Sequence, residues 1–487
     1  MQGMTTAVLG HLMEIITIIN VLLAITVIFL ERRNAGVTWA WLMVLQFIPV
    51  VGFILYMFFG QNLGRRKLYK ISAREQQLVQ SVTESQLEEI RTNSYPFIDP
   101  AAAEYRDMMI MNLRGGLALH TQDNEVDIYI NGEDKFQALL RDIKGARKHI
   151  HLMYYIVHND GIGRRLLEAL TEKAKEGVEV RFLYDDIGST KLPSGFFQPL
   201  RQAGGSAVAF FPTKIPYFNI RVNYRNHRKL AIIDSNIGYI GGYNIGDEYL
   251  GLSARFGLWR DTHLRVRGSA VMQMQAQFLL DWNLSSANKL QASPHYFFSL
   301  FHTESKVGMQ ILSSGPNDSM EQIRNAYIKM IHKAKKSVWI QTPYLIPDES
   351  LVNALQMAAL SGVDVRIMIP ATPDHKMVYW VTYSYLGELL PVGVRCFLYG
   401  NGFLHAKTIV VDGAVSSVGT ANFDIRSFKL NFEINAFVYD SGVGARLQRI
   451  FEKDLEACTE LTASEYARRS VLQKMKESFV RLLSPIL

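Results

Sequence analysis

The sequence predicts an α/β protein in which a pair of N-terminal membrane-spanning helices precedes two similar halves. Three observations lead to this prediction. Two long apolar runs lie near the N-terminus, a strand–helix–strand pattern occurs twice, and each copy is followed by the same spaced group of polar residues. We therefore expect four segments: a transmembrane helical hairpin over 1–60, a polar linker over 61–120, a first half over 121–300, and a second half over 301–487 that ends in an amphipathic helix.

The composition limits the class of protein. The chain has 487 residues, 48% of them hydrophobic, and a formal net charge of +7. These values exclude a disordered, collagen-like or small disulfide-stapled protein. The two cysteines, Cys396 and Cys458, are too few for a disulfide framework and favour a reducing compartment. The excess of base fits an anionic partner but does not choose between nucleic acid and phospholipid.

The two apolar runs cover residues 8–30 and 37–59. The second run and the 15–30 part of the first contain no charged residue, and each run is about long enough to cross a bilayer as a helix. A cleaved signal peptide is one alternative, but no Lys or Arg precedes Arg32 and the first run is too long. Pro49 and Gly52 leave a re-entrant hairpin open, and buried core helices are the last alternative.

Basic residues near the hairpin predict its orientation. Arg65, Arg66, Lys67 and Lys70 follow the second run, whereas the connecting turn carries only Arg32 and Arg33 beside Glu31. The positive-inside rule then places the residues after Leu68 in the cytoplasm. We expect a multi-pass protein of the cell membrane with its catalytic domains on the cytoplasmic side.

The rest of the chain alternates between predicted helices and strands. Residues 61 to about 110 are polar and helix-prone, and a break follows at 93–96. Beyond Val126, helices are expected over 135–147 and 164–176, and strands over 150–157 and 178–184. This alternation is typical of an α/β architecture.

An internal repeat is the most specific feature of the sequence. Residues 146–156 and 177–181 recur as 334–346 and 362–366. Each copy is followed by a His with Lys at +2, Asp at +7, Gly at +14 and Asn at +17. The two sets are His227, Lys229, Asp234, Gly241 and Asn244, and His405, Lys407, Asp412, Gly419 and Asn422. Because both matches are in register, we expect the same fold twice.

The residue types in this pattern favour phosphate chemistry. Residues i and i+2 of a strand face the same side, so each His can reach one ligand together with its Lys. The aspartates, at an odd spacing and at the strand ends, are expected to fix local loops. Two histidines, two lysines and two asparagines around a shared cleft form a cationic site rich in hydrogen-bond donors. No Cys cluster or His-Glu-x-x-His helix indicates a metal, and no Gly-rich fingerprint indicates a nucleotide cofactor, so we expect neither.

The duplicated pattern resembles the signature of the phospholipase D superfamily. The N-terminal and C-terminal regions are similar to those of bacterial cardiolipin synthases within it, and the resemblance covers essentially the whole chain. The residues concerned are Trp39 to Leu42, Pro49, Gly52, Tyr56, Phe59, Gly60, and Arg481 to Leu487. Gly241-Gly242 in the first copy and Gly419-Thr420 in the second depart from the commoner Gly-Ser pair of the family, but both substitutes remain small.

The resemblance implies two phospholipase D-like α/β domains that form a pseudo-dimer with one active site. It implies a phosphatidyltransferase that converts two phosphatidylglycerol molecules into cardiolipin and glycerol through a phosphohistidine. By analogy His227 is the nucleophile and His405 the general acid/base, although the similar copies leave this order open. The motif lysines and aspartates complete the catalytic set, and Lys229, Lys407, Asn244 and Asn422 would hold the non-bridging oxygens.

The family also orients each histidine with a carboxylate further along its own half. The candidates are Asp261, at +34 from His227, and Glu433, at +28 from His405. The alternative for either residue is an acid with a purely structural role.

Two other functions remain open at this stage. The same phosphohistidine could be hydrolysed by water, giving a lipid or nucleic-acid phosphodiesterase, and the membrane hairpin disfavours a nucleic-acid partner. A catalytically silent membrane scaffold would be free to lose the motif residues, which are intact. The oligomeric state is not predicted.

Two peripheral features have both a functional and a structural interpretation. Arg221, Arg225 and Arg228 could form a membrane-facing rim or be ordinary solvated arginines. An apolar stripe near the C-terminus could lie on the bilayer, although packing on the fold is the default expectation. The stripe comprises Val471, Leu472, Met475, Phe479, Leu482 and Leu483.

Overall fold

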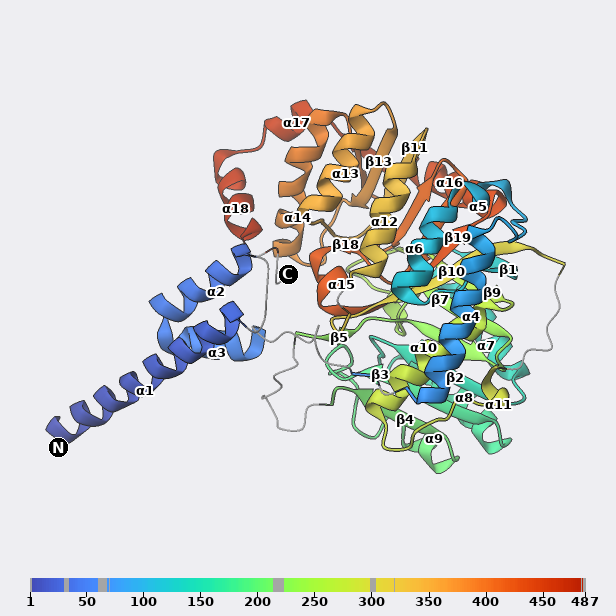
Figure 1. Cartoon of the computed structure of the whole chain (residues 1–487), viewed down its shortest axis with the longest axis horizontal. Coiled ribbons are helices and arrows are strands. Elements are labelled where there is room, and N and C mark those ends of the chain that lie inside the picture. The colour runs from blue at the N-terminus through green and yellow to red at the C-terminus, as the bar shows by residue number, and fades with distance from the viewer. Residues whose placement is uncertain are drawn as a thin grey trace. The chain divides into compact units, whose positions relative to one another are not determined.

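The computed structural model describes residues 2–29, 35–59, 68–69, 71–212, 223–297, 304–318, 320–482 and 484. The chain divides into two compact units (Figure 1). The smaller unit comprises Met1–Arg66 with Thr213–Tyr224, and the larger comprises Lys67–Pro212 with Arg225–Leu487. Each unit is described by itself.

The smaller unit consists of α1 (Gln2–Phe29), α2 (Ala35–Phe47) and α3 (Pro49–Phe59). The prediction of a single helix over 37–59 is wrong, because the run is divided just before Pro49. Proline lacks a backbone N–H, and its ring disfavours helical geometry in the residue before it. Among the residues that the structure describes, no helix combines the length and the apolar character needed to cross a membrane.

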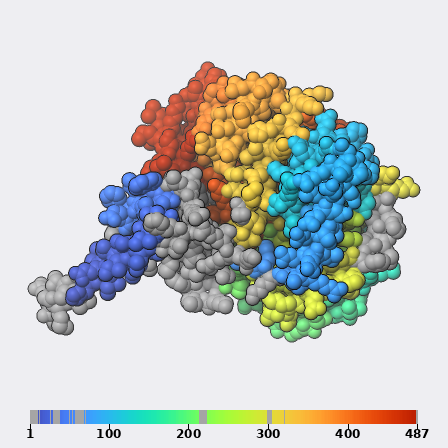
Figure 2. Space-filling view, viewed as in Figure 1, coloured from blue at the N-terminus to red at the C-terminus, as the bar shows by residue number. Residues whose placement is uncertain are grey.

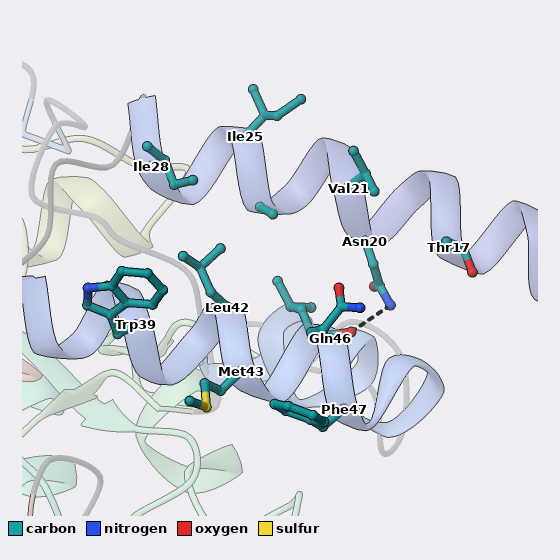
Figure 3. A pocket seen from close by; sticks show the side chains of 12 residues that line it. Thr17, Asn20, Val21, Ile25, Ile28, Trp39, Leu42, Met43, Gln46 and Phe47 are labelled. Carbon is teal, nitrogen blue, oxygen red and sulfur yellow. Dashed lines mark hydrogen bonds between the residues drawn. The ribbon is translucent and has the colours of Figure 1, made fainter.

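The three helices pack through a small apolar core of Val27, Leu45 and Tyr56. A groove of about 470 Å³ runs between α1 and α2 (Figure 3). On its wall the buried Asn20 donates a hydrogen bond from Nδ2 to the carbonyl oxygen of Leu45 at 3.1 Å. Many apolar side chains of these helices remain exposed, Ile18, Trp39 and Phe47 among them.

The larger unit is organised by one long mixed sheet that contains strands of both halves. The two halves join where β1 and β10 pair antiparallel, with Thr121 opposite Met309. In spatial order, the first half contributes β4 (Ser206–Phe210), β3 (Glu179–Asp185), β2 (His149–Tyr154), β6 (Leu230–Ile233), β7 (Ile237–Gly241), β9 (His263–Arg267) and β1 (Thr121–Tyr129). The second half continues with β10 (Val307–Ser314), β19 (Asn431–Tyr439), β17 (Val415–Gly419), β16 (Thr408–Val411), β11 (Ser337–Gln341), β13 (Asp364–Pro370), β14 (Arg395–Tyr399) and β20 (Cys458–Leu461).

The strand order confirms the duplication. In the first half β2 pairs parallel with β3 and antiparallel with β6, and β6 continues to β7 and β9. In the second half β11 pairs parallel with β13 and antiparallel with β16, and β16 continues to β17 and β19. The two halves therefore present equivalent strands in mirrored order along one sheet.

Helices cover the sheet and complete a hydrophobic core for each half (Figure 1). The first half contains α7 (Gly132–Gly145), α8 (Gly161–Lys175), α9 (Gln198–Gln202), α10 (Ala270–Ser285) and α11 (Pro294–Phe297). The second contains α12 (Gln322–Lys333), α13 (Glu349–Leu360), α14 (Lys376–Leu389), α15 (Ile425–Lys429), α16 (Ser441–Leu455), α17 (Ala463–Ala467) and α18 (Val471–Arg481). Short 3₁₀ turns lie at Asp247–Leu250 and Leu390–Val392.

The polar, helix-prone region expected as a linker contains three helices in the structure. These are α4 (Ala73–Arg91), α5 (Pro100–Glu104) and α6 (Arg106–Gly116). Ser72 caps α4 in a reciprocal capping box with Glu75. Met108 and Met109 of α6 are fully buried in the core of the second half. This segment thus belongs to the larger unit.

Candidate active site

His227 lies just after the short strand β5 (Arg225–Asn226), which pairs parallel with β19 of the second half. The backbone N–H of His227 donates to the carbonyl oxygen of Phe432 at 2.9 Å. This pairing sets the imidazole beside the next residue of β19, Glu433. His227 Nδ1 lies 2.9 Å from one carboxylate oxygen of Glu433 and 3.0 Å from the other. An ionised carboxylate only accepts, so Nδ1 carries the proton and Nε2 is the nitrogen left for chemistry.

His405 is held in the same way by the first half. It follows β15 (Phe403–Leu404), which pairs parallel with β8 (Trp259–Arg260), and its N–H donates to Arg260 at 2.7 Å. Its Nδ1 lies 2.6 Å from Oδ2 of Asp261. A Cβ at Gly242 would lie 2.0 Å from the Asp261 carboxylate, so the glycine makes room for this contact.

The assignment of each carboxylate to the histidine of its own half is wrong. Glu433 of the second half contacts His227, and Asp261 of the first half contacts His405. The physical reason is the exchange of short strands between the halves, since β5 joins β19 and β15 joins β8. Each half therefore completes the site of the other.

The two motif lysines are fully buried, each against the histidine of its own motif. Lys229 Nζ donates to the carbonyl oxygen of His227 at 2.6 Å, and Lys407 Nζ donates to that of His405. Lys407 acts electrostatically on His227, and Lys229 acts on His405, so both copies of the motif share one electrostatic environment. The expectation of a single cationic site is consistent with this proximity.

Burial sets the protonation of the histidines. Desolvation lowers the pKa of His227 to about 4, with repulsion from Lys229 partly offsetting the attraction of Glu433. Desolvation and Lys407 likewise lower the pKa of His405 to about 4. Both imidazoles are thus neutral at pH 7 in the free protein. A bound phosphodiester anion would raise both values, because a nearby negative charge favours the imidazolium.

The lysines also titrate near neutrality. Burial lowers the pKa of Lys229 to about 7 and that of Lys407 to about 8. Desolvation tends to raise the pKa of Glu433, but His227 and Lys229 outweigh it and the net shift is downward. The carboxylate therefore stays ionised and keeps the Nδ1 proton of His227 in place.

The two motif aspartates, placed in the catalytic set, bind the backbone of neighbouring loops rather than the side chains of His227 and His405. Asp234 accepts the backbone N–H groups of Arg147, Lys148 and His149 at 2.7–3.0 Å. Asp412 accepts those of Lys335, Lys336 and Ser337 at 2.7–2.9 Å. The odd spacing from the histidine predicted this loop-fixing role. Both aspartates have a left-handed backbone, with φ of 53° and 54°.

The motif asparagines are bound to protein groups rather than poised as open donors. Asn244 accepts the N–H of Ile156 at 3.1 Å and donates to Tyr249 at 3.3 Å. Asn422 donates to Asp424 at 3.0 Å. To contact substrate oxygens as predicted, the two asparagines would have to break these hydrogen bonds and donate to the substrate.

Two buried Arg–Asp pairs support the site, and the sequence reasoning did not identify them. Arg228 is buried, pairs with Asp281 of α10 at 2.6 Å and donates from Nε to the carbonyl oxygen of Glu433 at 3.1 Å. The interpretation of Arg228 as part of a membrane-facing rim is therefore wrong. Arg221 lies outside the described residues.

The second pair contacts the backbone of Asp261, the residue that binds His405. Arg260 pairs with Asp454 of α16 at 2.7 Å and donates to the carbonyl oxygen of Asp261 at 2.5 Å. Asp281 and Asp454 each stand three residues after a phenylalanine on equivalent helices, α10 and α16. This shared Phe-x-x-Asp spacing is the sequence signal that predicts the two aspartates as equivalent residues.

The arrangement suits nucleophilic attack on a phosphodiester. Each imidazole has its Nδ1 fixed by a carboxylate, and two ammonium groups lie close enough to stabilise charge that develops on phosphoryl oxygens. Within the described part of the chain, no group of three or more His, Cys, Asp or Glu side chains is placed to hold a metal ion. The described residues thus provide a nucleophile, an acid/base and charge stabilisation.

The fold and site define a two-domain protein of the phospholipase D type, and comparison with known proteins agrees. The family model described as "Cardiolipin synthase, PLD-like domain" matches residues 139–282 and 327–455. The model "Phospholipase_D-nuclease N-terminal" matches residues 18–61. These matches cover both halves and part of the N-terminal hairpin region.

Curated relatives extend the match to nearly the whole chain. The chain is 51% identical to a cardiolipin synthase of Listeria welshimeri over 98% of this chain and 99% of the relative. It is 52% identical to the major cardiolipin synthase of Bacillus subtilis, with the same coverage. The chain belongs to the cardiolipin synthase family. A crystal structure of phosphatidylserine synthase from Haemophilus influenzae shares the fold, with a TM-score of 0.60, 15% identity, and coverage of 79% of this chain and 100% of that one.

Proposed function

We propose that this protein is a cardiolipin synthase that joins two phosphatidylglycerol molecules through a phosphohistidine on His227. The observation that carries the proposal is the pair of buried histidines, each with Nδ1 bound to a carboxylate of the opposite half. The family relationship supports the choice of lipid. No cofactor takes part in the proposed reaction, because the two imidazoles supply both the nucleophile and the proton transfer.

The first half-reaction uses His227 as the nucleophile. Its neutral Nε2 forms a bond to the phosphorus of phosphatidylglycerol while the bond from phosphorus to the glycerol oxygen breaks. His405, protonated once the anionic lipid is bound, gives its proton to the leaving oxygen, and glycerol departs. Lys229 and Lys407 stabilise the charge that builds on the non-bridging oxygens.

The second half-reaction reverses these roles. A hydroxyl of a second phosphatidylglycerol gives its proton to the neutral His405 and attacks the phosphorus. The bond from phosphorus to His227 breaks, cardiolipin forms, and the free imidazole is restored. Water in place of this hydroxyl would release phosphatidic acid, which is the hydrolase alternative.

A matched assay separates these outcomes. Purified protein is incubated with phosphatidylglycerol without nucleotide or added metal, and lipids and glycerol are measured together, beside a His227→Ala control. Equal amounts of cardiolipin and glycerol, both lost in the control, support the proposal. Phosphatidic acid without cardiolipin would make the protein a hydrolase, and no product would favour another donor or a scaffold.

We further propose that the smaller unit anchors the protein in the cell membrane, with the larger unit on the cytoplasmic side. The support is its exposed apolar surface and the basic residues that follow it in sequence. A multi-pass hairpin predicts that a membrane-impermeant maleimide added outside spheroplasts labels an Asn34→Cys variant. A re-entrant hairpin, which the break at Pro49 would suit, predicts no labelling from outside.

A further inference from the structure

The C-terminal helix α18 has two chemically distinct sides. Five large apolar side chains lie on one side of the helix and are 62–76% exposed: Val471, Leu472, Met475, Phe479 and Leu482. Their spacing of one, three and four residues places them in a single stripe. Glu477 and Val480, on the opposite side, are buried. The default expectation that the stripe packs on the fold is therefore wrong.

The helix is fixed to the larger unit, so the stripe is held outward. Ser470 caps its N-terminus by accepting the N–H of Gln473. Arg481 pairs with Glu388 of α14 and stacks 4.5 Å from the ring centre of Tyr385. Lys476 of α18 lies over the ring of Trp380, which also belongs to α14. Figure 1 shows α18 beside α14, and Figure 2 shows the red C-terminal segment at the molecular surface.

Charge indicates what covers the stripe. The exposed Lys474 and Lys476 lie on either side of it, and the exposed Arg468 precedes the helix. A second copy docked through the same stripe would bring its own Lys474 and Lys476 toward those of the first copy, which is unfavourable because like charges repel. An anionic lipid surface satisfies both the apolar stripe and its basic borders.

We propose that α18 docks the larger unit on an anionic phospholipid bilayer, with the stripe inserted at the boundary of headgroups and acyl chains. The choice of a bilayer rests on the proposed phosphatidyl transfer, whose substrates are membrane lipids. This contact is separate from the helices of the smaller unit. It holds the larger unit itself against a lipid surface.

A probe on the stripe tests the docking without turnover. The full chain with His227→Ala, Cys458→Ser and Met475→Cys is labelled with an environment-sensitive fluorophore and placed in phosphatidylcholine vesicles with or without phosphatidylglycerol. We expect blue-shifted emission and quenching by lipids spin-labelled at shallow acyl positions, both stronger with phosphatidylglycerol. The matched control carries Glu172→Cys, on the exposed side of α8, in place of Met475→Cys. Its probe should remain accessible to aqueous iodide.

Two results would overturn the proposal. Iodide-accessible emission from the α18 probe in anionic vesicles would show that the stripe does not dock. Blue-shifted emission without quenching by spin-labelled lipid would show that protein covers it, from the smaller unit or a second copy. Because the His227→Ala protein cannot form the proposed intermediate, this readout is independent of whether the chemistry is correct.

Activity provides the second measurement. The Leu472→Glu, Phe479→Glu double variant changes two exposed side chains, so it should fold normally. We expect it to need roughly tenfold more phosphatidylglycerol at the vesicle surface for half-maximal turnover, with kcat unchanged. An unchanged surface requirement would contradict a role for docking. Loss of kcat in the double variant would also contradict it, if the same two substitutions leave the quenching of the Met475→Cys probe unchanged.

Discussion

Glu433 accepts a hydrogen bond from His227 at 2.9 Å, although the two residues belong to different halves of the chain. Asp261 and His405 repeat the relationship in the opposite direction at 2.6 Å. Both halves of the chain therefore contribute residues to the site. Each of these two pairs takes its histidine from one half and its carboxylate from the other.

Glu433→Gln should lower kcat by about 10²–10⁴-fold with little change in thermal stability. An amide can donate as well as accept, so it no longer fixes the proton on Nδ1 of His227. Asp261→Asn should act in the same way on His405. The measurement is cardiolipin formation beside a thermal melt, and a kcat within threefold of the unchanged protein would show that the carboxylate does not orient the imidazole.

Gly242→Ala should reduce kcat by about 10²-fold. The added Cβ would lie 2.0 Å from Asp261 Oδ1, which forces the carboxylate away from His405. Gly145→Ala is the matched control, because a Cβ there meets nothing within 4 Å. Equal activity of the two variants would refute the close approach at Gly242.

The pH dependence follows from the shifted groups. With both histidine pKa values near 4 and that of Lys229 near 7, the free enzyme has neutral imidazoles and a charged Lys229 between these limits. His227 must be neutral and His405 must carry a proton for the leaving oxygen, so we expect kcat/KM to be greatest near pH 4 and to fall on both sides of it. The fall should become steeper above about pH 7 as Lys229 loses its charge. In Lys229→Arg the remaining activity should lack this steeper limb, since arginine stays protonated. An acid limb near 6.5 would contradict buried neutral histidines.

Asp234→Ala and Asp412→Ala should each destabilise the protein by about 1–3 kcal/mol, because each leaves three backbone N–H groups without their acceptor. Denaturant unfolding measures this loss. The folded fraction should retain kcat. A large loss of kcat at unchanged stability would return these aspartates to the catalytic set.

Much of the fold could be predicted because the repeat is encoded in local patterns. The aspartate loops and the α/β alternation depend on spacing within about twenty residues. The prediction that the His-x-Lys segments lie on strands is wrong, because residues 227–229 lie between β5 and β6, and residues 405–407 lie between β15 and the next strand, β16. The exchange of carboxylates depends on β5 and β8, two-residue strands that pair with the other half and carry no periodicity of their own. The paired arginines were missed for the same reason, since Arg228 and Asp281 are 53 residues apart. The apolar pattern of residues 37–59 predicts one helix, but Pro49 divides the run into α2 and α3.

The most direct test of the central claim is to locate the covalent phosphatidyl group. Protein quenched during turnover of phosphatidylglycerol labelled at phosphorus is digested with trypsin, which separates His227 in Asn226–Arg228 from His405 in Cys396–Lys407. The account predicts acid-labile label on the His227 peptide and none in His227→Ala. Label confined to the His405 peptide would reverse the roles of the two histidines, and an absence of label under conditions that produce cardiolipin would contradict a phosphohistidine intermediate.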